Sequence, residues 1–379
     1  MPERFPGYPP RKRARPVGRM NPTATGKRLE VVGGADPMDP EPRIVVLRAL
    51  RGVGDLLCAV PALRALRTAY PRAQVTLAGL PSSAWFVARY PNLVDDLLVV
   101  EGVAGLPEVP PDPPAAVRFL QRAQSKRFDL GLQIHGSGIV TNPLLTLFGA
   151  RHQVTAYLPG HWVPPGRSID YLTEVPEIGR NLAVVGAAGC PPAGFGLDLP
   201  MTHDERQTAA QLLHNAGVAG RRFACLHPGA SRPDRRWPAL SFASVGDHLV
   251  SRGLPVVMTG STDEAGLVRA IAHMIDGQAI DLAGRTGLGV LAALYRQACL
   301  VVTNDTGASH VAAAVRVPSV VVTASAEPDR WAPLDRYRHR VVTGDPPSEW
   351  PDVHAVVTAI EEHLERWPAT DDGCTSEEA

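Results

Sequence analysis

A strand–helix alternation that runs through the first half of the chain and restarts near residue 222 is the strongest constraint on its fold. Short β-branched runs mark the strands of the first half, namely "RIVVLRA", "QVTLAG", "DLLVV", "FDLGLQI" and "QVTAY". The second half repeats the pattern with "RFACLHPG", "LPVVMTG", "AIDLAG", "CLVVTND" and "SVVVTA". Helical patterns separate most of them, including 56–70, 170–187, 238–251, 263–275 and 288–296. Such alternation predicts an α/β chain with parallel sheets covered on both faces, arranged as two Rossmann-like domains.

The Pro/Gly-rich stretch "AAGCPPAGFGLDLP" predicts the boundary between these domains. We expect an N-terminal domain over 43–200 and a C-terminal domain over 201–350, which suits a chain of 379 residues. A closing helix is predicted over 351–367, with Pro351 in its first turn. One face of that helix would carry Val353, Val356, Val357, Ile360 and Leu364.

The two ends of the chain have a different composition. Residues 1–42 carry nine prolines, and eight Lys or Arg fall within the first 28 residues. This predicts a disordered basic extension without the apolar segment of a secretory signal. An arm that binds a membrane surface or a partner is the alternative. The polar tail 368–379 is likewise predicted to be disordered.

Charge and cysteine content restrict the partners and the compartment. The formal net charge is zero, which argues against nucleic acid as a partner and leaves at most a peripheral membrane contact. Five scattered cysteines lack metal-ligand spacing and predict a reducing compartment, so we expect a cytoplasmic protein. The most apolar stretch is too short to span a bilayer.

The first loop that could carry functional residues lies in "VLRALRGVGDLLCAVPALRAL". Gly52 and Gly54 let the backbone turn tightly and approach a ligand closely. A dinucleotide fingerprint needs a third glycine, which this segment lacks, and this disfavours an NAD-dependent oxidoreductase. Asp55, taken alone, is best interpreted as a helix N-cap.

The second loop is "CLHPGASRPDRRWP", which follows a buried strand. Its small residues and arginines, among them Ser231 and Arg235, suit an anion such as a diphosphate. A solvated basic loop with Trp237 as a packing anchor explains the same residues equally well.

The third loop is "VVTNDTGASHVAAAV", with the tripeptide of aspartic proteases at its centre. Such a protease needs two of these elements in an all-β setting, so we exclude that function here. Instead, residues 306–309 would begin a helix whose free N–H groups attract anions, with Gly307 allowing close approach. Asp305 is expected to hold the loop through hydrogen bonds from backbone N–H groups. His310 suits both a phosphate donor and a packed helix histidine.

Glu264, just past a predicted strand in "VVMTGSTDEAGLV", is a weaker candidate. Its carboxylate could accept ribose hydroxyls. An acidic residue in the first turn of a helix is an equally economical interpretation.

Together these stretches resemble glycosyltransferase family 9, the heptosyltransferase-type enzymes with a GT-B fold. The resemblance is carried by the segment Arg48–Leu63, by "HPGASRPDRRWP" and by "NDTGASHVAAA", and it covers roughly residues 43–366. It implies two Rossmann-like domains that face each other across a cleft.

The resemblance also implies roles for individual residues. It assigns the general base to Asp55 and the diphosphate-binding basic residue to Arg235, where the family usually has lysine. The donor site is expected to include Gly54, Ser231, Glu264, Thr286, Asp305, Thr306, Gly307, Ala308 and His310. Within it, Glu264 would bind ribose and the backbone from Thr286 to Leu288 would line the base. The family needs no metal or other cofactor, and cationic side chains with the helix N-terminus would stabilise the departing diphosphate.

The implied function is an inverting, metal-independent glycosyltransferase. It would move a sugar, with heptose expected, from a nucleotide-diphospho-sugar such as ADP-heptose to a hydroxyl of a glycan, lipid or small-molecule acceptor. The acceptor would contact the first domain, where "QIHGSGIVTN" and Arg89 occupy suitable loops. The alternatives are a GT-B epimerase or hydrolase of sugar nucleotides, and a catalytically silent nucleotide-sugar-binding protein.

Overall fold

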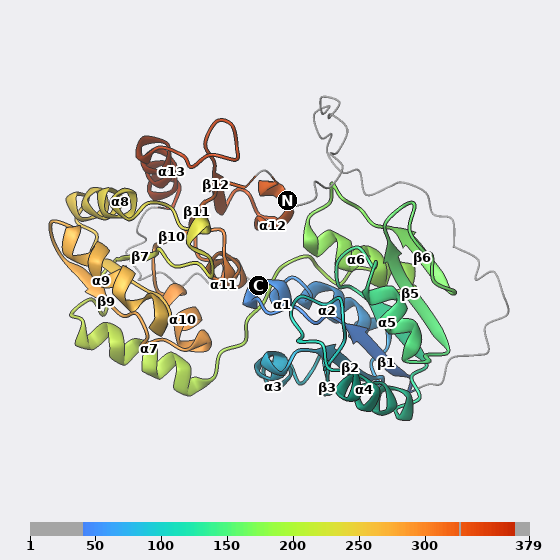
Figure 1. The fold of residues 1–379 in the computed structure, drawn as a ribbon. Helices are drawn as coiled ribbons and strands as arrows, with labels where there is room; N and C mark the ends of the chain where they lie inside the picture. The colour runs from blue at the N-terminus through green and yellow to red at the C-terminus, as the bar shows by residue number, and fades with distance from the viewer. Residues whose placement is uncertain (1–40, 326, 368–379) are drawn as a thin grey trace. The chain divides into compact units, whose positions relative to one another are not determined.

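Two parallel sheets of six strands each organise the protein (Figure 1). The computed structural model describes residues 41–325 and 327–367. The predicted tail 368–379 and all but the last two residues of the predicted extension 1–42 therefore lie outside the described residues.

The first sheet has the strand order β3-β2-β1-β4-β5-β6, and every neighbouring pair is parallel. Its strands are β1 (Arg43–Leu47), β2 (Gln74–Gly79), β3 (Asp96–Val99), β4 (Leu130–Gln133), β5 (His152–Tyr157) and β6 (Arg167–Asp170). The apolar run of β1 is buried throughout, as expected for a central strand covered by helices on both faces.

The second sheet repeats this order, as β12-β11-β10-β7-β8-β9. Its strands are β7 (Ala224–His227), β8 (Val256–Met258), β9 (Ala279–Asp281), β10 (Leu300–Asn304), β11 (Ser319–Val322) and β12 (His339–Val342). All ten strands predicted from the sequence are present. Two of the four edge strands, β6 and β12, escaped prediction because their sequences, RSID and HRVV, lack a continuous apolar run.

Six helices accompany the first sheet. They are α1 (Val53–Leu57), α2 (Val60–Ala69), α3 (Ala84–Arg89), α4 (Pro113–Ser125), α5 (Thr141–Leu147) and α6 (Glu177–Ala187). The helix predicted over 56–70 is thus divided into α1 and α2. The prediction of a helix over 170–187 was wrong in its first third, because Asp170 ends β6 and α6 begins only after Pro176.

Seven helices accompany the second sheet. They are α7 (His203–Asn215), α8 (Ala239–Ser251), α9 (Ala265–Met274), α10 (Leu288–Tyr295), α11 (Gly307–Ala314), α12 (Pro328–Trp331) and α13 (Val353–Arg366). Figure 1 shows α8 and α13 on one side of this sheet and α7 with α10 on the other. The helices predicted over 238–251, 263–275 and 288–296 are confirmed within two residues at each end.

The closing helix α13 packs against α8 and against the edge of the second sheet. Val356, Ile360 and Leu364 are buried on one face, as the periodicity predicted. Its N-cap is Asp352, which accepts a hydrogen bond from Ala355 N–H at 2.7 Å. The expectation that Pro351 lies in the first turn was therefore wrong, because the helix begins two residues later.

The point where the strand order reverses is the same in both sheets. It lies between β1 and β4 in the first sheet and between β7 and β10 in the second. Ligands of open parallel sheets bind beyond the carboxyl ends of the strands at this reversal. The loops singled out in the sequence follow β1, β7 and β10, so all three lie at these positions. The predicted domain limits at 200 and 350 stay predictions.

Candidate active site

Asp55 lies in the turn that follows β1. It is the third residue of α1, and its Oδ2 accepts a hydrogen bond from Gly52 N–H at 3.1 Å. The N-cap interpretation was wrong, because Gly52 occupies the N-cap and the Asp55 carboxylate reaches back to it. Burial raises the pKa of Asp55, against the lowering effects of the Arg48 guanidinium and the Gly52 N–H group. A half-buried carboxylate with a raised pKa is a better proton acceptor than a solvated one.

Arg48, to which the sequence assigned no role, is fully buried beneath this turn. Its Nε donates a hydrogen bond to the carbonyl of Asp55 at 2.7 Å. Its Nη1 donates to the carbonyl of Ile134 and lies 3.1 Å from Glu177 Oε1. A charged residue at the end of an apolar strand was the only signal of this arrangement in the sequence.

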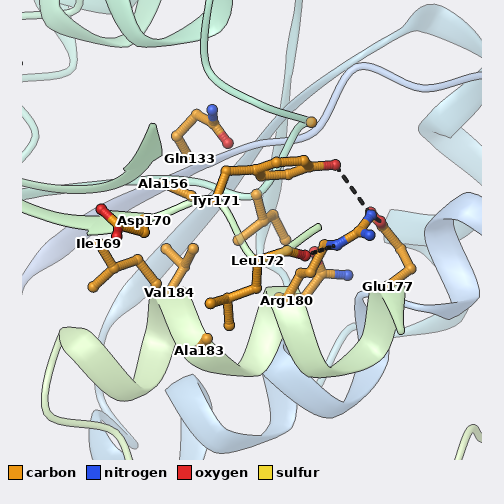
Figure 2. Close-up of a pocket in the computed structure, with 13 residues that line it drawn as sticks. Gln133, Ala156, Ile169, Asp170, Tyr171, Leu172, Glu177, Arg180, Ala183 and Val184 are labelled. Carbon is orange, nitrogen blue, oxygen red and sulfur yellow. Dashed lines mark hydrogen bonds and ion pairs between the residues drawn. The ribbon is translucent and has the colours of Figure 1, made fainter. Parts of the chain in front are cut away.

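A pocket in the first domain adjoins the buried ion pair (Figure 2). It is lined by residues at and beyond the ends of β4 to β6 and by α6, including Gln133, Ala156, Ile169 and Val184. Figure 2 shows Tyr171, Arg180 and Glu177 side by side along it. Arg180 Nη1 donates to the Tyr171 hydroxyl at 3.0 Å and lies 3.3 Å from Glu177 Oε2.

The segment 133–142, where an acceptor was expected, holds itself together by buried hydrogen bonds. Gln133 Oε1 accepts from His135 N–H at 2.7 Å, and Gln133 Nε2 donates to Asn142 Oδ1 at 3.0 Å. His135 Nδ1 accepts from Ala49 N–H at 3.0 Å. Burial lowers the pKa of His135 to about 4, so the imidazole is neutral near pH 7. These contacts give Gln133 and His135 structural roles.

Arg89 was expected to lie in a loop, but the structure places it in a helix. It ends α3, and its guanidinium pairs with both carboxylate oxygens of Glu205 and with the carbonyl of Pro200. Glu205 in turn belongs to the first turn of α7. Arg89 therefore joins the first domain to the helix that opens the second half of the chain.

The loop after β7 places Arg235 at the end of a single 3₁₀ turn, Pro233–Arg235. The Arg235 side chain is 47% exposed, and its Nη2 donates to the carbonyl of Asp305 at 2.7 Å. Ser231 is exposed in the same loop. Trp237 is buried and anchors the loop through a hydrogen bond from its backbone N–H to Asn304 Oδ1 at 3.0 Å. The loop is thus both anchored by Trp237 and open to an anion.

The loop after β10 begins α11. Thr306 is the N-cap, and its hydroxyl accepts from Ala308 N–H at 3.3 Å. The Asp305 carboxylate lies 3.7 Å from Arg235 Nη2, which corrects the expectation that it accepts from backbone N–H groups. Burial raises the pKa of Asp305, and the guanidiniums of Arg235 and Arg336 oppose this. Arg336 was missed because its loop lies thirty residues further along the chain.

His310 is buried where α11 packs against α1. Its Nδ1 lies 3.7 Å from Cys58 Sγ. A Cβ atom added at Gly54 would lie 2.3 Å from His310 Cδ2, and one added at Gly307 would lie 3.3 Å from the Cβ of Val53. Both glycines therefore allow the loop after β1 and the loop after β10 to meet. Burial lowers the pKa of His310 to about 4.

Glu264 ends a 3₁₀ turn after β8, where its Oε2 accepts from Ser261 N–H at 2.7 Å and from the Ser261 hydroxyl at 2.9 Å. A Cβ atom at Gly229 would lie 2.3 Å from Glu264 Oε1, so the carboxylate covers the loop after β7. Thr286 is half-buried just before Gly287, the N-cap of α10. The predicted donor-site residues of the second sheet thus lie in or directly beyond the loops after β7, β8, β9 and β10.

Within residues 41–325 and 327–367, no group of three or more His, Cys, Asp or Glu side chains could hold a metal ion. In the same part of the chain no helix is both long and apolar enough to cross a membrane.

Residues 173–355 match the family model described as glycosyltransferase family 9 (heptosyltransferase). The matched part contains the loops after β7, β8 and β10 but not Asp55. Lipopolysaccharide heptosyltransferase 2 of Escherichia coli K12 is 36% identical over 124 residues, which are 31% of this chain and 36% of that protein. Lipopolysaccharide heptosyltransferase 3 of the same strain is 24% identical over 75% of this chain and 83% of its own length. The chain thus spans little more than a third of the length of the heptosyltransferase 2 relatives that it matches.

Solved structures extend the likeness to most of the chain. A glycosyltransferase family 9 protein of Veillonella parvula DSM 2008 has a TM-score of 0.69 at 22% identity, over 88% of this chain and 100% of its own. The E. coli heptosyltransferase WaaC with ADP has a TM-score of 0.61 at 19% identity, over 85% and 99%. The iron-containing dodecameric glycosyltransferase TibC of enterotoxigenic E. coli H10407 has a TM-score of 0.50 at 15% identity, over 86% and 80%. At these identities the likeness shows the fold, and the chain has the GT-B fold that the sequence predicted.

Proposed function

We propose that the chain is an inverting glycosyltransferase that uses a nucleotide-diphospho-sugar, since residues 173–355 match the model of glycosyltransferase family 9 and its curated relatives are heptosyltransferases. The observation that carries the proposal is the contact between α1 and α11. It brings the loop of Asp55 against the helix N-terminus at Thr306 and Gly307, so a proton acceptor and an anion-binding element adjoin.

The donor is proposed to bind the second sheet. The N-terminus of α11, whose dipole favours an anion, and the exposed guanidinium of Arg235 suit a diphosphate. Ser231, Ala308 and the neutral imidazole of His310 complete this set, with His310 acting mainly by packing.

The nucleoside is proposed to lie beyond β8 and β9. Glu264 would accept the ribose hydroxyls, and the backbone around Thr286 would line the base. ADP-heptose is our proposed donor, because the similar WaaC structure contains ADP and the curated relatives are heptosyltransferases.

In the proposed reaction Asp55 takes the proton of an acceptor hydroxyl as that oxygen attacks the anomeric carbon. The bond from the anomeric carbon to the diphosphate oxygen breaks on the opposite face, which inverts the configuration. The leaving diphosphate gains negative charge that Arg235 and the α11 N–H groups stabilise.

We propose that this chemistry needs no metal, although the similar TibC structure contains iron. The acceptor is proposed to be a glycan, lipid or small molecule bound by the first domain. We place the reaction in the cytoplasm, with at most a peripheral membrane contact.

Isothermal calorimetry with ADP, UDP and GDP, with and without EDTA, followed by transfer assays with ADP-heptose, tests the proposal. Selective ADP binding that survives EDTA, together with acceptor-dependent release of ADP, is the expected result. Preference for UDP or GDP would exclude the proposed donor. Loss of binding or transfer in EDTA, restored by a metal ion, would exclude the metal-free mechanism.

A further inference from the structure

The helix that carries Asp55, α1, is too short to be stable on its own. α1 has five residues, well below the length at which an isolated helix is stable in water. The last carbonyls of any helix lack partners within it. Here Asp55 O accepts from Arg48 Nε at 2.7 Å, and Cys58 O accepts from Asn181 Nδ2 at 2.9 Å. Side chains from the end of β1 and from α6 therefore fix the position of α1.

The Arg48 guanidinium is itself locked in place. It is fully buried, and its Nη1 lies 3.1 Å from Glu177 Oε1 and 3.2 Å from Asn181 Oδ1. Glu177 is also buried and is held from its other oxygen by Arg180. Breaking a buried ion pair leaves an uncompensated charge, which is strongly unfavourable. The carbonyl of Ile134 after β4 and the side chains of Glu177 and Asn181 on α6 all contact Nη1, so they restrict the position of the guanidinium.

We propose that Arg48 is a positioning residue for the reaction: it holds the turn that carries Asp55, and its charge, balanced by Glu177, faces the Asp55 carboxylate. The inference rests on the proposed function for the role of Asp55 as the base. The contacts themselves do not depend on that role.

The charges that face Asp55 come from each element packed around it. Arg48 at the end of β1 lowers the pKa of Asp55, whereas Glu177 of α6 and Glu108 of the loop before α4 raise it. His135 after β4 and His310 of α11 are neutral near pH 7, because burial lowers the pKa of each to about 4. Burial of Asp55 is the largest effect and raises its pKa.

Removing the charge of Arg48 and removing that of Glu177 should therefore shift the pKa of Asp55 in opposite directions. The Arg48→Met variant removes the cation and leaves the anions, so the pKa rises. The Glu177→Gln variant removes the anion with the larger effect and leaves the cation, so the pKa falls. A nearby charge of either sign typically moves a carboxyl pKa by about one unit or more.

The experiment is an NMR titration of the full chain with ¹³C-labelled aspartate carboxyls, in which the Asp55→Asn variant identifies the Asp55 signal. We expect the signal of Arg48→Met to titrate about one unit higher than that of the wild type, and that of Glu177→Gln about one unit lower. The acid limb of kcat/KM in the transfer assay should move in the same two directions. Arg48→Lys keeps the charge but has no planar fork, so the pKa should stay near the wild-type value while kcat falls about tenfold or more.

Arg67→Met is the matched control. Arg67 is a partly buried arginine of the same domain that pairs with Asp95 at 2.7 Å and contacts neither α1 nor α6 through its guanidinium. It should leave the Asp55 titration unchanged.

Shifts in the same direction for Arg48→Met and Glu177→Gln, or an unchanged Asp55 titration in a folded Glu177→Gln variant, would overturn the inference. If Arg48→Met does not fold, Glu177→Gln and Arg48→Lys still decide it. The proposed function is tested by a different measurement. Normal transfer by an Asp55→Asn variant would contradict the role of Asp55 as the base, whereas the NMR shifts would still test the contacts that position it.

Discussion

The two sheets share one strand order but place different chemistry where that order reverses. Beyond the first sheet lies a half-buried carboxylate, Asp55, above the buried pair of Arg48 and Glu177. Beyond the second lie small residues, a helix N-terminus and the half-exposed Arg235. The topology thus fixes where a site forms, and the residues in the loops fix what it does.

The two arginines make the difference concrete. Arg48 has no exposed surface and every short contact of its Nε and Nη1 is to the protein, so it serves the fold of the site. Arg235 contacts Asp305 but keeps 47% of its side chain exposed, so it is free to bind a ligand. The same residue type therefore has a structural use after β1, whereas in the loop after β7 its exposure is consistent with the ligand-binding role that we propose.

The largest expected effect comes from the first sheet. The Asp55→Asn variant should lose about 10² to 10⁴-fold in transfer rate, since an amide cannot accept the acceptor's proton. Initial rates with saturating donor measure this loss. Undiminished turnover in the variant would contradict the proposal that the first sheet supplies the base and the second binds the donor.

The next largest effect is expected in ligand affinity, when a residue beyond the second sheet is changed. Arg235→Ala should weaken binding of a nucleoside diphosphate by about 1.5–3 kcal/mol, the usual contribution of a charged hydrogen bond, and leave adenosine binding unchanged. Calorimetry measures both. The matched control is Arg232→Ala, because Arg232 is a neighbouring exposed arginine that pairs with Asp234. Equal losses in the two variants would mean that general charge, and not the place of Arg235, attracts the ligand.

The contact between the two loops can be broken sterically. Gly54→Ala would place a methyl group against His310, and overpacking of this kind costs about 1–3 kcal/mol. Thermal unfolding should show a lower midpoint. Gly266→Ala, in α9 with nothing near the added methyl group, should instead be neutral or stabilising by up to about 1 kcal/mol. A Gly54→Ala variant as stable as the wild type would show that α1 and α11 do not need this close approach.

The smallest effect concerns the link between the halves of the chain. The Arg89 guanidinium lowers the pKa of Glu205 to about 2 from its ordinary value of 4.5. The pair therefore contributes its full stability above pH 4.5, and this contribution is lost as pH falls from about 4.5 through 2. Arg89→Met should reduce stability at pH 7 by about 1 kcal/mol and make unfolding less pH-dependent in that window. Denaturant unfolding at pH 7 and pH 3 checks this, and an unchanged pH dependence would contradict the pairing.

The sequence predicted the features that depend on local pattern. Buried strands such as β1 and β10 are continuous apolar runs, and the glycines of the loops mark tight turns, so both sheets and the three loops could be found. The edge strands β6 and β12 are partly polar and were missed.

What the sequence did not predict depends on contacts between distant residues. Glu177 lies 129 positions from Arg48, and nothing in "VLRAL" indicates that its arginine is buried. Arg89 had the pattern of an exposed loop residue because its partner Glu205 lies 116 positions away. The local pattern around Asp55 predicts an N-cap at this residue, because Gly52, the true N-cap of α1, has no side chain by which the start of the helix could be recognised.

Calorimetric titration of ADP into the wild type, Asp55→Asn and Arg235→Ala, without added metal, tests the central claim most directly. The account predicts wild-type affinity for Asp55→Asn and at least tenfold weaker binding for Arg235→Ala, because the second sheet binds the donor and the first supplies the base. Weakened binding in Asp55→Asn together with unchanged binding in Arg235→Ala would contradict it.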